Sequence, residues 1–178
     1  MRKVEMSADS RETIPTVGAF GFYELQNLQN REAIPRVTRE QIITEARSWI
    51  GTPYQHLARA KGVGVDCSQF VIAVATALGY VEPDFNIPVH APRPHPRIFE
   101  ELTRHLDEIP IGEAKPGDIL IFCFNLRTRA PQHMAFVTDL GLCHVHPHTD
   151  IARVVEHRLD DYFRERIVSA WRFRGVED

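Results

Sequence analysis

The chain has 178 residues, enough for one ordinary domain, and 43% of its residues are hydrophobic while 25% are charged. This balance excludes a disordered chain, a collagen-like repeat and a coiled coil. The formal net charge of −3 excludes the strongly basic surface that nucleic acids and anionic membranes attract, so we expect neither as a main partner.

The N-terminal residues and the cysteines indicate where the chain is made. No apolar run follows the charged N-terminus, so we expect no secretory signal. The longest apolar stretches, such as 119–124, are far shorter than the about 20 residues that cross a bilayer. Three cysteines, Cys67, Cys123 and Cys143, do not resemble a disulfide framework. We therefore expect synthesis in a reducing cytoplasm.

The N-terminal third contains a polar segment and then the first helix. Residues 1–37 lack a sustained period, so we predict an N-terminal arm or tail, followed by one folded domain over 38–178. Thr38 and Gln41 form a capping box, and apolar residues at helical spacing follow. Gly51 ends the predicted helix.

A second predicted helix begins at Asp66 and Cys67, presents one apolar face and ends at Gly79. The Pro-rich segment 83–96 predicts a stiff loop, and a short third helix is expected over 98–106. After residue 118 the period becomes that of strands, at 119–124, 133–138, 142–146, 151–156 and 167–173. Helices followed by consecutive strands predict an α+β domain with an antiparallel sheet.

Cys67 is the candidate nucleophile. It follows a predicted N-cap, Asp66, so its sulfur lies near unpaired amides at the positive end of the helix dipole, where a thiolate is favoured. A buried structural cysteine is the commoner alternative, but polar neighbours surround Cys67 and the apolar helix face is already complete. Cys123 and Cys143 lie in apolar strands and are predicted to be structural.

A base is sought among nine histidines. His133 begins a strand whose small neighbours on one face, Ala135 and Val137, would let a helix approach. His144 and His146 share a face of the next strand, and either could orient His133 through a hydrogen bond. Alternatively, the histidines of 144–148 could chelate a metal, although no carboxylate or Cys partner has suitable spacing. The remaining histidines resemble solvated surface residues: His56, His90, His95, His105 and His157.

Four ordered segments, 51–54, 62–70, 115–122 and 132–136, resemble the motifs of the NlpC/P60 cysteine peptidases. The resemblance covers residues 39–174. It is strongest to the phage and gene-transfer-agent branch, because of Lys61-Gly-Val-Gly64 before the cysteine and the segments 154–156 and 167–173 near the end. It implies a papain-like α+β fold, in which N-terminal helices, one carrying the nucleophile, pack on a five- to six-stranded antiparallel sheet. The folded domain over 38–178 would then be the catalytic domain.

The resemblance also implies roles for individual residues. Cys67 would be the nucleophile, His133 the base and His146 the orienting residue of a Cys-His-His triad; a small shift in strand register would instead give that last role to His144. Tyr54 would lie near the sulfur and help bind the oxyanion. Asp66 and Ser68 would face the free amine of the substrate.

The implied reaction is hydrolysis of peptidoglycan stem peptides, at the bond between D-glutamate and the diamino acid, without metal or organic cofactor. Delivery to the cell wall by a phage-like particle or by lysis, and contacts with phage-tail-like proteins, are further expectations. Gln69 stands where the family has Gly, which bears on specificity. The alternatives are a Cys-His amidase or acyltransferase, or a non-catalytic tail component.

Overall fold

A computed structural model describes residues 36–85, 99, 103, 106–146 and 150–178. The predicted N-terminal arm, except its last two residues, and most of the Pro-rich loop lie outside the described residues. Within the described part of the chain, no helix has the length and apolar character needed to span a membrane.

Two helices precede the sheet, as predicted. Helix α2 spans Arg39–Arg47, and both hydrogen bonds of the capping box between Thr38 and Gln41 are present. Helix α3 spans Cys67–Ala77, with Asp66 as its N-cap. Of the predicted third helix, Phe99 and Thr103 are helical. The expectation that this helix includes Leu106 is wrong, because Leu106 begins a strand that pairs with the last long strand of the sheet.

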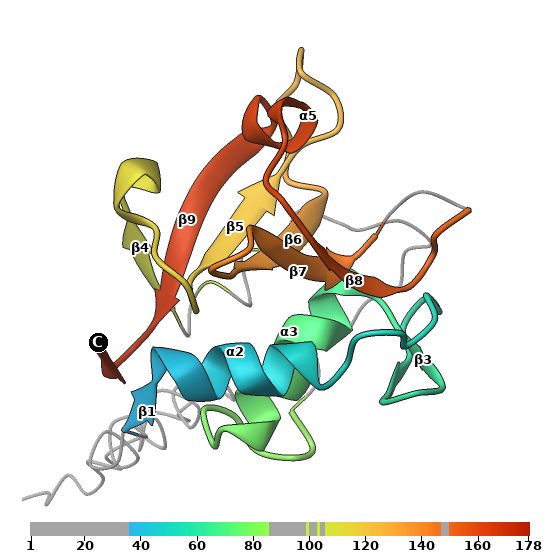
Figure 1. The fold of residues 1–178 in the computed structure, drawn as a ribbon, viewed down its shortest axis with the longest axis vertical. Helices are drawn as coiled ribbons and strands as arrows, with labels where there is room; N and C mark the ends of the chain where they lie inside the picture. The colour runs from blue at the N-terminus through green and yellow to red at the C-terminus, as the bar shows by residue number, and fades with distance from the viewer. Residues whose placement is uncertain (1–35, 86–98, 100–102, 104–105, 147–149) are drawn as a thin grey trace, which may run out of the picture. The chain divides into compact units, whose positions relative to one another are not determined.

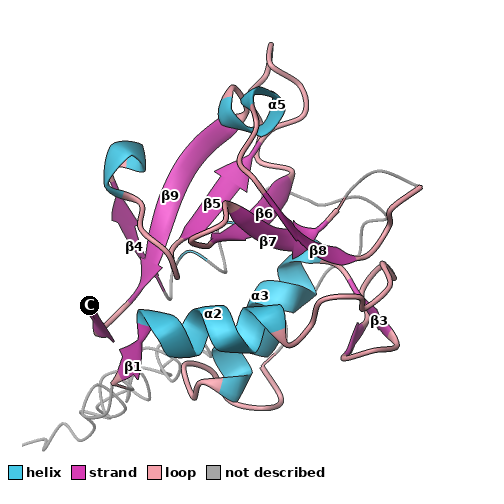
Figure 2. Ribbon diagram, in the orientation of Figure 1, coloured by secondary structure: helices cyan, strands magenta, loops and turns pink. Residues whose placement is uncertain are grey.

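The main sheet has six strands, all antiparallel, in the order β4-β9-β5-β6-β7-β8 (Figure 2). The strands are β4 Leu106–Ile109, β5 Ile119–Phe122, β6 His133–Val137, β7 Leu142–Val145, β8 Val154–His157 and β9 Ile167–Phe173. The five predicted strands and the α+β class are thus confirmed. Strand β4 was not predicted, because only its first and last residues are apolar.

Short elements complete the described chain. They are β1 Val37–Thr38, which pairs in parallel with β10 Val176–Glu177, the antiparallel pair β2 Arg59–Ala60 and β3 Gly64–Val65, the 3-10 helix η2 Ile111–Glu113 and helix α5 Asp161–Arg164. Helix α5 is capped by Asp160, which accepts a hydrogen bond from the Phe163 amide.

The two faces of the sheet are covered differently. Helices α2 and α3 lie against one face (Figure 1). On this face the ring of Phe70 meets that of Phe136 edge-on, with the ring centroids 5.3 Å apart. The opposite face is sealed by Phe163 of α5. Ala135 belongs to this second cluster with Phe163 of α5, so the prediction that the cysteine-bearing helix approaches over the small residues of His133's face is wrong. The side chains of β6 alternate, and α3 packs on the larger ones.

A buried carboxylate joins the helices to the sheet. Asp118, at the start of β5, is fully buried and accepts hydrogen bonds from Arg39 of α2 and Arg172 of β9. The two guanidinium groups hold the pKa of the Asp118 carboxyl below its usual value despite its burial. Asp118 therefore gives the turn at 115–118 a structural role, because it anchors this turn to α2 and β9.

Candidate active site

Cys67 is the first residue of α3, at the end of the helix that lies beside β3 and β8 (Figure 1). Asp66 Oδ1 accepts hydrogen bonds from the Gln69 amide at 2.9 Å and the Ser68 hydroxyl at 2.8 Å. Asp66 Oδ2 accepts from the Leu57 amide at 2.7 Å. The helix start is thus fixed by one buried carboxylate, while Cys67 remains partly exposed.

The ionisation of Cys67 differs from the expectation. Loss of hydration and the negative charge of Asp66 raise the pKa of the thiol to about 12, although hydrogen bonding from the backbone of Met134, Ser68 and Cys67 itself acts in the opposite direction. The helix-start amides do favour the thiolate, as predicted, but burial outweighs them. The resting thiol is therefore neutral, and its sulfur lies at the backbone of the residue that follows His133.

His133 is oriented by its neighbour on the next strand. Its Nε2 lies 2.6 Å from Nδ1 of His144, and both rings are buried. Within the described residues, Nδ1 of His133 has no hydrogen-bond partner, and no hydrogen bond joins it to Cys67. The nitrogen that remains available to a thiol is therefore Nδ1.

The structure places His144, rather than the predicted His146, against His133. The pairing of β6 with β7 ends at Phe136 and Cys143, so position 146 no longer follows β6. Instead, the amide of His146 donates to the carbonyl of Arg153 after the strand has ended. His144 lies diagonally across from His133 on the same face of the sheet, and the centroids of the two rings are 4.9 Å apart.

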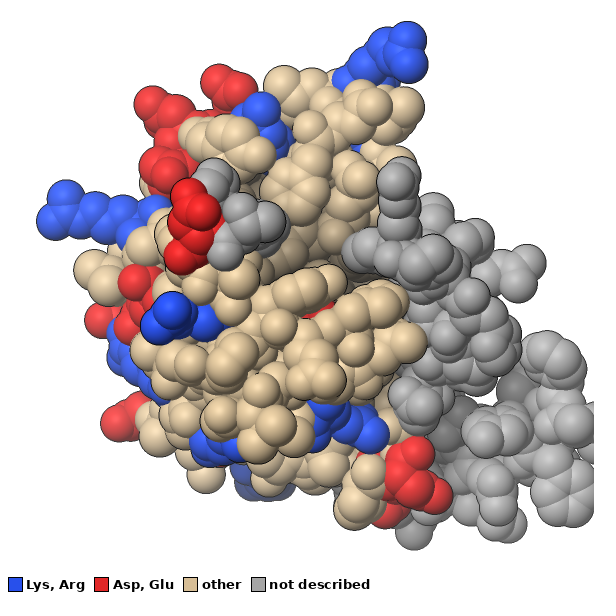
Figure 3. All heavy atoms as spheres, turned by 90° about the vertical axis from the view of Figure 1, so that its right-hand side faces the viewer, with Lys and Arg blue, Asp and Glu red and all other residues tan. Residues whose placement is uncertain are grey.

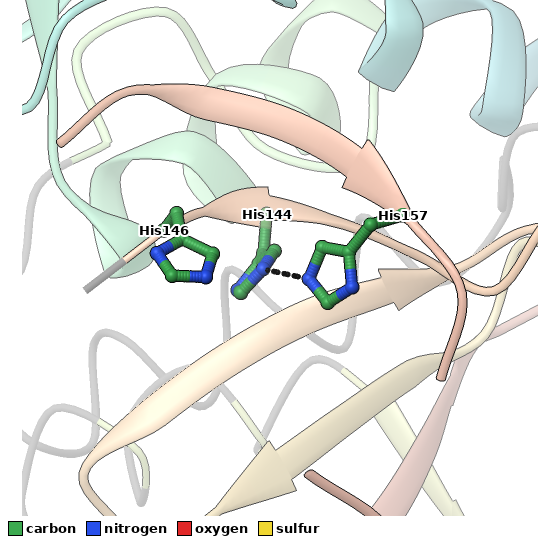
Figure 4. A group of neighbouring side chains, drawn as sticks. All are labelled: His144, His146 and His157. Atoms are coloured by element: carbon green, nitrogen blue, oxygen red, sulfur yellow. Dashed lines mark hydrogen bonds between the residues drawn. The ribbon is translucent and has the colours of Figure 1, made fainter. Parts of the chain in front are cut away.

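His157 was missed by the sequence analysis, which assigned it to the solvated surface. It lies at the end of β8, and its Nε2 is 2.8 Å from Nε2 of His144 (Figure 4). His144 pairs with Val155, so His157, two residues further, points to the same face. The signal that could have found it is this two-residue offset on a neighbouring strand.

Phe163 forms the wall behind these rings. Its ring meets that of His144 edge-on at 5.1 Å and lies 5.3 Å from that of His157. Burial of His133, whose ring lies near those of Phe122 and Phe124, lowers its pKa to about 3, with a smaller contribution from His146. Burial also lowers the pKa of His144 far below its ordinary value. Both rings are therefore neutral at physiological pH.

The remaining predicted site residues surround the helix start. Tyr54 is half-exposed and forms a bridge with Val65, two residues before Cys67. Partial burial, Asp66 and Cys67 raise the pKa of the Tyr54 hydroxyl, which is therefore a neutral donor near the sulfur. Asp66 and Ser68 are both buried, and the Ser68 hydroxyl donates a hydrogen bond to the Asp66 carboxylate. Figure 3 shows the face of the molecule that includes this end, with most of the charged side chains toward its margins.

Three histidines offer the geometry closest to a metal site in the described part of the chain. Ring nitrogens of His144, His146 and His157 lie within 4.8 Å of one another. Two of these nitrogens, however, already form the 2.8 Å hydrogen bond between His144 and His157. Two of the three rings, those of His144 and His157, are thus joined by a hydrogen bond.

Neither a protein-family model nor a curated protein matches the sequence. Solved structures do match. They include an NlpC/P60 family protein from Bacillus cereus, with a TM-score of 0.57, 19% identity and coverage of 79% of this chain and 41% of the other. An NLP/P60 family protein described as similar to lipoprotein, from Staphylococcus aureus, has a TM-score of 0.54 at 19% identity over 89% of this chain and 50% of the other.

The peptidoglycan hydrolase RipB from Mycobacterium tuberculosis has a TM-score of 0.51 at 19% identity, over 79% of this chain and 65% of its own. The chain thus spans between 41% and 65% of the length of these three proteins. Together with the helix that starts at a cysteine and the six-stranded antiparallel sheet, these likenesses define the NlpC/P60 fold, which is papain-like and of the α+β class. The predicted fold is confirmed.

Proposed function

We propose that this protein is a cysteine peptidase that hydrolyses peptidoglycan stem peptides, with Cys67 as nucleophile, His133 as base and His144 as the residue that orients the base. The observation that carries the proposal is the 2.6 Å hydrogen bond between His133 and His144, on the two strands beside the start of the cysteine-bearing helix. Support for the substrate comes from the likeness to RipB, which is described as a peptidoglycan hydrolase.

The mechanism starts from a neutral thiol and a neutral imidazole. As the sulfur of Cys67 attacks the peptide carbonyl carbon, the thiol proton moves to Nδ1 of His133. The resulting imidazolium keeps its hydrogen bond to His144 and is paired with the negative charge of the intermediate. When the C–N bond breaks, His133 returns this proton to the leaving amine, and a thioester remains on Cys67.

Hydrolysis of the thioester uses the same base. A water molecule gives a proton to Nδ1 of His133 while its oxygen attacks the thioester carbon. Breaking the C–S bond then releases the carboxylic acid, and the proton on His133 restores the Cys67 thiol. The backbone amide of Cys67 and the hydroxyl of Tyr54 would donate to the oxyanion in both halves of the reaction.

We further propose that the bond cleaved lies between D-glutamate and the diamino acid of the stem peptide. Asp66 is the buried negative charge nearest the sulfur, and together with Ser68 it would attract the free amine of a substrate whose N-terminus is unsubstituted. Gln69, which follows Ser68 and is also buried, would restrict which substrates can bind beside Asp66 and Ser68.

We also propose that the protein acts at the cell wall. The motif that precedes Cys67 and the segments 154–156 and 167–173 support the phage and gene-transfer-agent branch, and hence delivery to the cell wall by a phage-like particle or by lysis. Detection of this chain in purified particles by mass spectrometry would test it. Particles that lack the chain while it accumulates free in the cell would contradict delivery by particles.

The decisive experiment is turnover of purified muropeptides. We expect loss of at least about 10³-fold for Cys67→Ala and His133→Ala, and about 10- to 100-fold for His144→Ala. His146→Ala, the neighbouring histidine, should lose less than His144→Ala. Mass spectrometry of the products distinguishes a peptidase from an acyltransferase, which would leave the stem peptide uncut. Unchanged turnover by folded Cys67→Ala would refute the proposal.

A further inference from the structure

The hydrogen bond between His133 and His144 belongs to a longer chain. Nε2 of His133 lies 2.6 Å from Nδ1 of His144, and Nε2 of His144 lies 2.8 Å from Nε2 of His157. At the far end, Nδ1 of His157 lies 2.8 Å from the backbone carbonyl oxygen of Arg158. The chain thus crosses the adjacent strands β6, β7 and β8, and it ends on the edge strand.

The carbonyl at the end determines which nitrogens carry protons. A carbonyl oxygen can only accept, so Nδ1 of His157 carries its hydrogen, and in the neutral ring Nε2 must accept. Nε2 of His144 is then the donor to it, which leaves Nδ1 of His144 as an acceptor. Nε2 of His133 must therefore donate to His144, and Nδ1 of His133 keeps its lone pair.

We infer that His157 is a positioning residue that, anchored on the Arg158 carbonyl, holds His133 in the tautomer whose unprotonated Nδ1 can accept the thiol proton. The inference rests on the proposed function, because it concerns the base of that reaction. Without His157, His144 could adopt its other neutral tautomer and donate from Nδ1 to Nε2 of His133. His133 would then carry its own hydrogen on Nδ1. A base in that state cannot accept a proton from Cys67.

The surroundings of the three hydrogen-bonded histidines favour one fixed direction of donation along their hydrogen bonds. His144 is fully buried, so water cannot easily replace either of its partners. Phe163 packs against His144 and His157 and restricts the rotation of their rings. Gly141 also holds the end of β8 closely, since a Cβ there would lie 2.5 Å from the His157 carbonyl oxygen. The last ring is therefore held in place by packing as well as by its hydrogen bonds.

Matched substitutions at position 157 test the inference. In His157→Gln, the amide oxygen can accept from His144, whereas the ring of His157→Phe has a similar size but cannot accept. We expect kcat to fall about 10-fold in His157→Phe with little change in KM, and to recover to within about 3-fold of wild type in His157→Gln. Arg158→Ala removes an exposed side chain but keeps the carbonyl, and serves as the control with unchanged kcat.

A second readout needs no substrate. In ¹⁵N-histidine NMR spectra at neutral pH, His133 of the wild type should be protonated at Nε2 and unprotonated at Nδ1, and His157→Phe should add the opposite tautomer. Protonation of His133 at Nδ1 in the wild type would overturn the inference, even if His157→Phe fails to fold. So would a tightly bound zinc ion that His157→Phe abolishes. An inactive wild type with the expected tautomer would instead refute the proposed function alone.

Discussion

Acid should destabilise this protein through two buried histidines, His133 and His144. Burial lowers the pKa of His133 to about 3 and that of His144 further, while both rings titrate near 6.5 in the unfolded chain. Below about pH 6.5 these two histidines therefore bind protons in the unfolded state but stay neutral in the folded state. The stability contributed by the neutral rings is complete above that pH, and it is lost as the pH falls toward the folded pKa.

The magnitude follows from the unfolded pKa. When the pH falls from 7.5 to 5.0, each histidine that stays neutral in the folded state lowers the free energy of unfolding by about 2 kcal/mol. The reason is that pH 5.0 lies about 1.5 units below the unfolded pKa, and each unit is worth about 1.4 kcal/mol. His133 and His144 together give about 4 kcal/mol. This is a large part of the about 5 to 15 kcal/mol that stabilises a domain.

Urea unfolding at the two pH values, with EDTA present to exclude metal binding, measures this difference. In His144→Gln the difference between the two pH values should shrink by about 2 kcal/mol. Ala135→Gly, on the same face of the sheet, is the matched control: it should lower stability at both pH values and keep the wild-type difference. A difference in His144→Gln equal to that of the wild type would refute the reasoning.

Three further predictions concern the helix start, the ion pairs and the hairpin. With a pKa of about 12, Cys67 should react slowly with iodoacetamide at pH 7, at a rate that rises about 10-fold per pH unit toward pH 10, as followed by mass spectrometry. Asp118→Ala should lower the free energy of unfolding by about 3 to 5 kcal/mol in urea titrations, because two guanidinium groups lose their buried partner. Gly141→Ala should lower it by about 3 kcal/mol, since φ is +149° there and the added Cβ meets backbone at 2.5 Å.

Each of these predictions has a contradicting outcome, and the two substitutions also have a control on the same chain. Reaction of Cys67 that has already reached a plateau below pH 8 would indicate a preformed ion pair with His133. Asp178→Ala removes an exposed partner of Arg39, whose ion pair is screened by solvent, and should change the free energy of unfolding far less, so equal effects at both aspartates would contradict the role of Asp118. Gly112→Ala meets nothing within 4 Å and should be tolerated, unlike Gly141→Ala.

The sequence was informative wherever a local pattern has one physical meaning. The capping box at Thr38 and the N-cap at Asp66 determine where two helices begin, because each satisfies amides within three residues of itself. The predicted strands followed from their apolar runs. The chain position of Cys67 at a helix start could therefore be predicted without any tertiary information.

The histidine partnership could not be predicted in the same way. Choosing between His144 and His146 requires knowing where β6 and β7 stop pairing, and this depends on contacts made elsewhere in the sheet. The role of His157 was still harder to predict, because its partner His144 lies 13 residues away and its other hydrogen bond is to the backbone carbonyl of Arg158. The ionisation of Cys67 likewise depends on burial, which a helix position alone does not determine.

The electrostatics of the proposed site predict that substrate binding makes Cys67 easier to ionise. Within the described histidine chain no carboxylate stabilises an imidazolium, and Asp66 opposes the formation of a thiolate at Cys67. An ammonium group bound beside Asp66, as we propose for the free amine of the substrate, would offset that negative charge and lower the pKa of the thiol when a substrate is present. Stem peptides with a free N-terminus should therefore exceed their N-acetylated forms in kcat as well as in affinity. Steady-state kinetics on the two forms tests this, and an effect confined to KM would show that the amine contributes binding but not activation.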